Sequence, residues 1–264
     1  MNNLHRDLAP ISAAAWAQIE EEVARTFKRN LAGRRVVDTH GPSGAGLSAV
    51  GTGHYTRIEP PGDGVEARRR EVAALVELRR PFELSREAID DVERGSGDSD
   101  WQPAKDAATA LAIAEDRAIF HGYGAAAISG IVPASSHTPI PLPAEVTGYP
   151  EAIAQALSGL RMAGVDGPYT VLLGAEAYTG VTETSDHGYP VRAHIERMVD
   201  GEIIWAPALT GALVLTTRGG DYDLHLGQDL SIGYLSHTDA TVRLYLQESF
   251  TFLPFTAEAA VPLA

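Results

Sequence analysis

Cysteine is absent from the 264-residue sequence, and basic residues are scarce. Without cysteine the chain has no disulfide, no thiolate metal site and no cysteine nucleophile. Acidic residues outnumber basic ones by 35 to 21, which gives a formal charge of −14 and argues against nucleic-acid binding through phosphates. No apolar run is long enough to span a bilayer, and the first residues lack the pattern of a signal peptide. We therefore expect a cytoplasmic protein that binds neither nucleic acid nor a membrane.

Several catalytic motifs are also missing. The stretch GPSGAGLS (41–48) has the spacing of a phosphate-binding loop, but Leu47 stands where that loop needs lysine, and no helical pattern follows. No GxSxG nucleophile elbow occurs. The nine histidines are scattered, with neither an HExxH motif nor an i, i+4 pair, although distant histidines can converge in a fold. The sequence accordingly assigns no catalytic residue, no metal ligand and no cofactor.

Helical and stranded patterns follow one another irregularly. In residues 12–31 apolar residues recur every three or four positions, which predicts an amphipathic helix that Ser12 caps. This mixed order predicts an α+β protein with two lobes rather than an alternating βαβ sheet. The remaining helices are predicted at 85–95, 100–121, 150–163 and 190–201, strands at 34–38 and 169–174, a proline-rich linker at 133–150, and mostly strand from 222 onward.

Residues 54–82 contain two extended runs around the turn-forming PPGDG. Apolar alternation is confined to the second half, and the first part carries the charged sequence RRRE (68–71). A hairpin of this composition buries little in a core of its own. We predict that it lies against something else, so that the monomer is incomplete.

The stretch TRGGDYDLHLGQD (217–229) concentrates aspartate, histidine and glycine as a metal site would. It occurs once, whereas calcium-binding repeats need stacked copies, and it lacks the ligand series of an EF-hand loop. Apolar Tyr222, Leu224 and Leu226 alternate with polar residues. This alternation predicts a two-stranded hairpin with one buried and one polar face, with Gly219-Gly220 as its entry turn.

Eight stretches in order along nearly the whole chain resemble the encapsulins, and in particular the actinobacterial shell proteins described as linocin-type bacteriocins. They are NNLHRDLAPISAAAW, RTFKRNLAGRRVVD, DDVERGSGDSDW, AGVDGPY, TSDHGYP, IIWAPAL, TRGGDYDLHLGQDLSIGY and VRLYLQESFTF.

The resemblance implies the fold of phage major capsid proteins (HK97-type), with a peripheral domain, an axial domain and an extended loop. It also implies a closed icosahedral homo-oligomer of about sixty copies or a multiple. The spine helix would be 100–121. The implied division is 1–48 for the N-terminal helix and the start of the peripheral domain, 49–77 for the extended loop, 78–134 for the peripheral domain, 135–221 for the axial domain, and 222–264 for the peripheral C-terminal strands.

The resemblance further implies a cargo enzyme that docks on the inner wall through a C-terminal targeting peptide. In actinobacterial relatives the cargo is a dye-decolourising peroxidase or a ferritin-like iron protein. The positions that match the family's peptide groove are Phe27, Leu31, Arg34, Asp38, Leu230, Ile232 and Tyr234.

The loop TSDHGYP (184–190) matches the segment that forms the five-fold pore of the family, so Ser185, Asp186, His187 and Gly188 are its expected lining. Asp186 and His187 would form rings of charged and titratable groups around the pore. Some encapsulins bind flavin through a tryptophan in the segment that matches FELSREAID, but Arg86 occupies that place here. No flavin is therefore expected.

Two other functions compete with a cargo-enclosing shell. A phage or prophage capsid protein would have the same fold. A secreted hydrolase or bacteriocin is suggested only by the older family name, and neither a signal peptide nor a nucleophile motif supports it.

Overall fold

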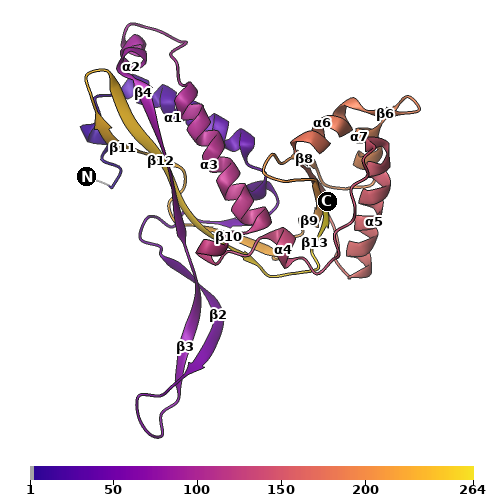
Figure 1. Cartoon of the computed structure of the whole chain (residues 1–264). Coiled ribbons are helices and arrows are strands. Elements are labelled where there is room, and N and C mark those ends of the chain that lie inside the picture. Colours follow the sequence, from indigo (N-terminus) through magenta and orange to yellow (C-terminus); the bar gives the residue numbers. More distant parts are fainter. Residues whose placement is uncertain (1–2) are drawn as a thin grey trace.

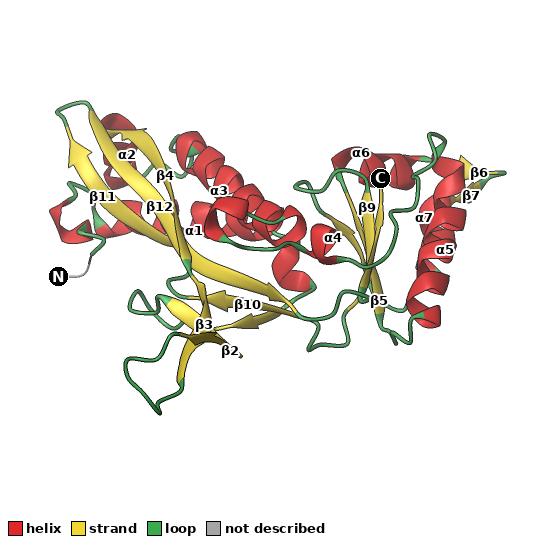
Figure 2. Ribbon diagram, turned by 60° about the horizontal axis from the view of Figure 1, so that its bottom comes forward, coloured by secondary structure: helices red, strands yellow, loops and turns green. Residues whose placement is uncertain are grey.

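The computed structural model describes residues 3–264, which form two lobes and a projecting arm (Figure 1). The first lobe is a sheet of five strands in the order β1-β10-β12-β11, with β4 on the other edge of β12. The second lobe has a sheet in the order β13-β9-β5-β8. Figure 2 shows the lobes side by side, with α1, α2 and α3 in the first and α5, α6 and α7 in the second. This arrangement confirms the α+β class and the two lobes expected from the sequence.

The helices are α1 (Ala13–Asn30), α2 (Arg86–Glu93), α3 (Gln102–His121), α4 (Ile131–Ala134), α5 (Tyr149–Met162), α6 (Ala175–Glu183) and α7 (Val191–Glu196). The strands are β1 (Asp38–His40), β2 (Ala49–Ile58), β3 (Ala67–Ala74), β4 (Val76–Ser85), β5 (Tyr169–Leu173), β6 (Ser185–Asp186), β7 (Tyr189–Pro190), β8 (Ile203–Trp205), β9 (Ala212–Thr216), β10 (Tyr222–Leu226), β11 (Ser231–His237), β12 (Thr241–Pro254) and β13 (Ala260–Leu263).

Helices α1 and α3 pack together on one face of the first sheet. The apolar stripe predicted for α1 is buried, and Ser12 accepts a hydrogen bond from the Ala15 N–H as the expected cap. On α3, Ala104, Ala108 and Ala112 are fully buried and lie in the same core as α1. Because alanine has a small side chain, the two helix backbones can approach closely. No helix among residues 3–264 is long and apolar enough to cross a membrane.

A continuous core joins the lobes. Leu172 and Leu213 of the second sheet share one buried cluster with Leu224 and Phe252 of the first sheet. A further core lies between the second sheet and helices α5, α6 and α7. The lobes are therefore coupled by buried apolar contact.

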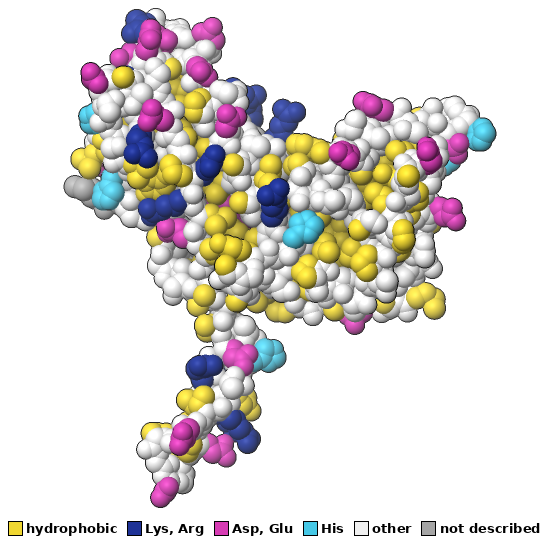
Figure 3. Space-filling view, in the orientation of Figure 1, with side chains coloured by type: hydrophobic (Ala, Val, Ile, Leu, Met, Phe, Trp, Pro, Cys, Tyr) yellow, Lys and Arg dark blue, Asp and Glu magenta, His cyan; other side chains and the backbone are white. Residues whose placement is uncertain are grey.

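The arm consists of β2 and β3, which pair only with each other among the described strands. Its apolar side chains remain open to solvent, with Tyr55 48%, Ile58 47%, Val65 51% and Val72 58% exposed. Figure 3 shows the arm as a narrow projection that carries both hydrophobic and charged side chains. A polar hairpin without a core of its own is confirmed, but its bounds differ from the predicted 54–82. It spans 49–74, whereas residues 76–82 belong to β4, which pairs with β12.

The structure differs from the sequence prediction at 217–234. The alternation is correct, since Tyr222, Leu224 and Leu226 are buried, but β10 and β11 do not form a hairpin. Both strands pair antiparallel with β12, β10 with residues 250–254 and β11 with 242–247. The chain therefore continues in one direction along β12, because a periodicity of two specifies the buried face but not the pairing partner.

Other local predictions need smaller corrections. The strand expected at 34–38 is replaced by a 3₁₀ turn at Gly33–Arg35 followed by β1. The helix expected at 190–201 ends at Glu196. Strand β13 pairs with β9 in the second sheet, although the expected division assigned all of 222–264 to the first lobe.

Gly130 allows the close approach of two backbone segments after α3. A Cβ at Gly130 would overlap the backbone of Gly122 and His121, whereas a Cβ at Gly124 would meet nothing within 4 Å. We expect Gly130→Ala to destabilise the protein by about 1–3 kcal/mol through overpacking, and Gly124→Ala to have little effect. Thermal unfolding of both variants at matched concentration checks this, and equal unfolding temperatures would contradict it.

Candidate functional site

A groove of about 900 Å³ runs beside α1, at the end of the helix that leads into the 3₁₀ turn. Phe27, Leu31, Arg34 and Leu230 of the sequence-predicted set line it. A smaller cavity of about 280 Å³ lies beside it, since Ala24 and Leu230 line both. Ile232 lines this second cavity. Five of the seven predicted groove residues are thus brought together between α1 and the start of β11.

Phe27, Leu31 and Ile232 contribute mainly to the core. They are 4%, 7% and 4% exposed, and all three belong to the cluster between the helices and the first sheet. The partly buried Leu230 packs against the same cluster. These side chains therefore form an apolar floor that small movements of Leu230 would widen.

The groove is bordered by cations although the protein is acidic. Its lining includes one carboxylate, from Asp229, and the basic side chains of Arg25, Lys28, Arg29, Arg34 and Arg35. The residues that line the groove thus include more basic than acidic side chains, whereas the whole chain has a formal net charge of −14. Arg25, Arg34 and Arg35 form ion pairs with Glu22, Glu115 and Glu202. Lys28 and Arg29 form no ion pair within residues 3–264, and these two supply the excess positive charge at the groove.

Arg34 anchors the groove to the core through three carboxylates. Its guanidinium donates to both carboxylate oxygens of Glu115, at 2.7 and 2.5 Å. It also donates to Asp229 at 2.8 Å and to Glu248 at 3.1 Å. Its charged group lies 5.3 Å from the centre of the Phe27 ring. Burial lowers the pKa of Arg34, but the hydrogen bonds and charge of Glu115 and Asp229 outweigh it, so that Arg34 stays charged.

The two fully buried glutamates beside Arg34 are not equivalent. Burial first, and then the charge of Glu115, raises the pKa of Glu248 well above its usual range. Glu115 faces Arg34 with two hydrogen bonds, whereas Glu248 has one. Glu115 therefore holds Arg34 through the closer, two-point contact, and Glu248 is the buried carboxyl whose charged form is disfavoured.

A second buried carboxylate fixes the chain just after α1. Asp116 on α3 accepts hydrogen bonds from the N–H groups of Ala32 and Gly33, at 2.8 and 2.9 Å. Burial raises the pKa of Asp116 to about 7, although these two backbone hydrogen bonds lower it. A Cβ at Gly33 would lie 2.7 Å from Ile119 Cδ1 and 2.8 Å from Asp116 Oδ1, so any larger residue would require these side chains to shift. The turn that carries Arg34 is therefore held rigidly against α3.

Two predicted groove residues lie elsewhere. Asp38 accepts a hydrogen bond from the Gly220 N–H at 2.5 Å and lines a separate cavity of about 130 Å³. Tyr234 lies further along β11, packs against the core and forms a hydrogen bond with His237. Neither lines the groove beside α1.

Several groove residues were missed from the sequence. Ala24 lies one helical turn before Phe27, and Lys28 lies one turn from both Ala24 and Leu31, so the helical period alone could have found them. Leu4 and Arg6 line the smaller cavity, and no local pattern connects them to α1.

The loop at 184–190 is a two-residue hairpin between β6 and β7 at the outer end of the second lobe (Figure 1). His187 and Gly188 both have positive φ, 45° and 83°, as the central residues of a type I′ turn require. The His187 side chain is 98% exposed and lies 3.7 Å from Asp186. The loop therefore presents an ionisable pair to solvent.

The arrangement of two lobes and an unpartnered arm is that of capsid and virus-like-particle subunits. The chain is similar to the virus-like particle of Pyrococcus furiosus, with a TM-score of 0.66 and 15% identity, covering 94% of this chain and 99% of that one. It is also similar to the capsid of Myoviridae phage XM1, with a TM-score of 0.53 and 10% identity, covering 86% and 88%. At these identities the likeness shows the fold, which is the HK97-type capsid fold expected from the sequence.

The family follows from sequence comparison. Residues 1–251 match the family described as "Encapsulating protein for peroxidase". The chain is 63% identical over 264 residues to the type 1 encapsulin shell protein of Rhodococcus erythropolis, with all of both chains covered. The chain therefore belongs to the encapsulin shell protein family, which confirms the resemblance found in its motifs.

The contacts of Arg34 predict different effects for its two buried glutamates. Glu115→Gln breaks the two-point ion pair with Arg34 and should cost about 3 kcal/mol or more. Glu248→Gln removes a single, longer contact from a carboxyl whose pKa burial raises, so its cost should be smaller. Thermal unfolding at matched concentration compares the two variants, and the reverse order of stability would contradict this assignment.

Proposed function

We propose that this chain is the structural subunit of a closed icosahedral compartment of about sixty copies, or a multiple of that number, in the cytoplasm. The structure of the arm is the observation that most directly supports this proposal. Its two strands pair only with each other, and its apolar side chains lack a core within the described chain. Neighbouring copies would supply that core. The capsid fold and the encapsulin shell relatives support this assembly.

We further propose that the groove beside α1 faces the interior and binds the C-terminal peptide of an enclosed enzyme. Apolar side chains of the peptide would contact Leu230 and the exposed edges of Phe27, Leu31 and Ile232. The cationic border would attract the free carboxylate at the end of the peptide. A peroxidase is the favoured cargo, because the matching family is described as encapsulating one. We propose a dye-decolourising peroxidase, with a ferritin-like protein as the second candidate.

The second lobe is proposed as the axial domain, over residues 135–221, with Ser185–Gly188 around the five-fold pore. The exposed pair of Asp186 and His187 at a protruding turn supports this placement. Repeated around an axis, these groups would form a ring whose charge depends on the protonation of histidine.

The competing functions have less support. A phage capsid protein shares the fold. However, this chain is only 10% identical in sequence to the capsid protein of phage XM1, whereas it is 63% identical to the encapsulin shell protein of Rhodococcus erythropolis. Shell proteins are structural, and the family match indicates no catalytic activity. We therefore propose that the chain itself performs no catalysis.

The arm gives the first test of assembly. Ile58→Asp combined with Val72→Asp places two charges on apolar positions that neighbours would bury, so closed particles should be lost while the subunit stays folded. Met162→Asp, at a position 86% exposed on α5, serves as the comparison. Electron microscopy and size exclusion chromatography measure the outcome. An unaltered protein that stays monomeric at every concentration would contradict the proposal.

The groove is tested best at Leu230, because Phe27 is too deeply buried to be replaced without disturbing the core. Leu230→Asp should leave particles intact but reduce co-purification of a co-expressed peroxidase by at least about tenfold, since about 1.5–3 kcal/mol of apolar contact is lost. Leu235→Asp is the control, because Leu235 is 45% exposed on β11 and lies outside the groove. Unchanged loading of Leu230→Asp shells would reject the groove but leave the shell proposal standing.

A further inference from the structure

Two histidines and an aspartate from distant parts of the chain meet on one face of the first sheet. Strand β1 pairs in parallel with β10, which sets His40 opposite His225 and Asp38 opposite Asp223. On β10 the alternate residues Leu224 and Leu226 point into the core, so Asp223 and His225 point to the opposite face. This pairing brings together histidines that are 185 positions apart and that no local motif connects.

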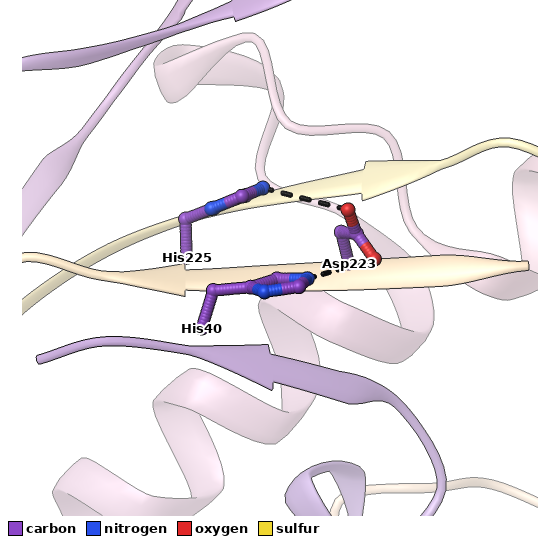
Figure 4. A group of neighbouring side chains, drawn as sticks. All are labelled: His40, Asp223 and His225. Atoms are coloured by element: carbon purple, nitrogen blue, oxygen red, sulfur yellow. Dashed lines mark ion pairs between the residues drawn. The ribbon is translucent and has the colours of Figure 1, made fainter. Parts of the chain in front are cut away.

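The three side chains converge at their polar ends. His40 Nε2 lies 3.1 Å from one oxygen of Asp223, and His225 Nε2 lies 3.6 Å from the other. The two imidazole rings are stacked, with centroids 4.6 Å apart and planes at 19°. Figure 4 shows both rings turned toward Asp223. Ligand atoms from all three residues lie within 4.8 Å of one another, and no other such trio occurs in residues 3–264.

We propose that His40, Asp223 and His225 bind one divalent transition-metal ion, with zinc as the best fit. Two imidazole nitrogens and one carboxylate oxygen are a ligand set that zinc accepts, with bonds of about 2.0–2.1 Å. Tetrahedral bonds of this length place ligand atoms about 3.3 Å apart. The two Nε2 atoms lie 3.1 and 3.6 Å from different oxygens of Asp223, so each separation is near that value but the two involve separate oxygens. Coordination through one oxygen therefore requires a rotation of the carboxylate or of an imidazole ring.

The site would keep one coordination position open. The His40 side chain is 50% exposed, whereas Asp223 and His225 are 21% and 20% exposed. A metal ion can therefore enter from the side of His40 and retain a water molecule there.

The location gives the ion a structural role. Strand β1 has three residues and is the last sheet element before the loop that leads to the arm. A metal bridge between His40 and His225 would fasten the root of the arm to β10. Binding should therefore raise the unfolding temperature of the protein, whether or not it is assembled.

Untagged protein, treated with a chelator and then dialysed, provides the test. Titration with zinc chloride should give one equivalent per subunit by calorimetry, and cobalt chloride should give visible absorption bands of a nitrogen-ligated ion. His40→Ala and His225→Gln should each weaken zinc binding at least about tenfold. His121→Ala should bind as the unaltered protein does, because His121 is exposed at the end of α3 and outside the trio.

Absence of saturable zinc binding, or equal affinity in His225→Gln, would overturn the proposal. If a variant fails to fold, X-ray absorption of the zinc-loaded unaltered protein decides the matter. Two imidazole ligands per zinc support the site, and one or none contradicts it. These measurements do not depend on shell formation or cargo loading.

Discussion

The first lobe depends on one long strand. Strand β12, with 14 residues, pairs with β4 along one edge and with β11 and β10 in succession along the other. One of its faces contributes Val242, Leu244 and Leu246 to the core under α1 and α3, and the same face carries Glu248 beneath Arg34. Since β10 and β11 both take their register from β12, the apolar floor of the groove and the polar face near His225 are fixed by the same ladder of hydrogen bonds.

The arm shows why the folded chain is incomplete. Folding normally buries apolar side chains, yet residues such as Ile58 and Val72 stay half exposed on a hairpin with no other strand beside it. An isolated two-stranded hairpin is at best marginally stable in water. A surface that is costly for a monomer becomes useful when neighbouring copies cover it, and repeated contacts of this kind can close into a cage.

The sequence was informative where local periodicity decides the outcome. The stripe on α1 and the alternation at Tyr222–Leu226 predicted which residues are buried, and both predictions are confirmed.

The pairing of strands was not predictable from local periodicity in the same way. Alternation at 222–234 suggested a hairpin, but both strands pair with β12: β10 with residues 24 to 32 positions later, and β11 with residues 5 to 16 positions later. His40 and His225 converge for the same reason, because parallel pairing of β1 with β10 is a long-range event without a local signature. The structure brings Phe27, Leu31 and Arg34 of the motif-derived set to one groove and places Asp38 elsewhere, since motif resemblance reports chain order rather than side-chain direction.

A single short segment, residues 32–40, connects the groove to the arm. Its start is held by Asp116 through the Ala32 and Gly33 N–H groups, and Arg34 then reaches Glu115. Further along, Asp38 binds the Gly220 N–H and His40 contacts Asp223. The contacts at the start of the segment go to α3, through Asp116 and Glu115, and those at its end go to Gly220 and to Asp223 of β10, so both ends are attached to the first lobe. A peptide in the groove and a neighbour on the arm would therefore meet surfaces that folding has already positioned, and neither event needs a large rearrangement of the subunit.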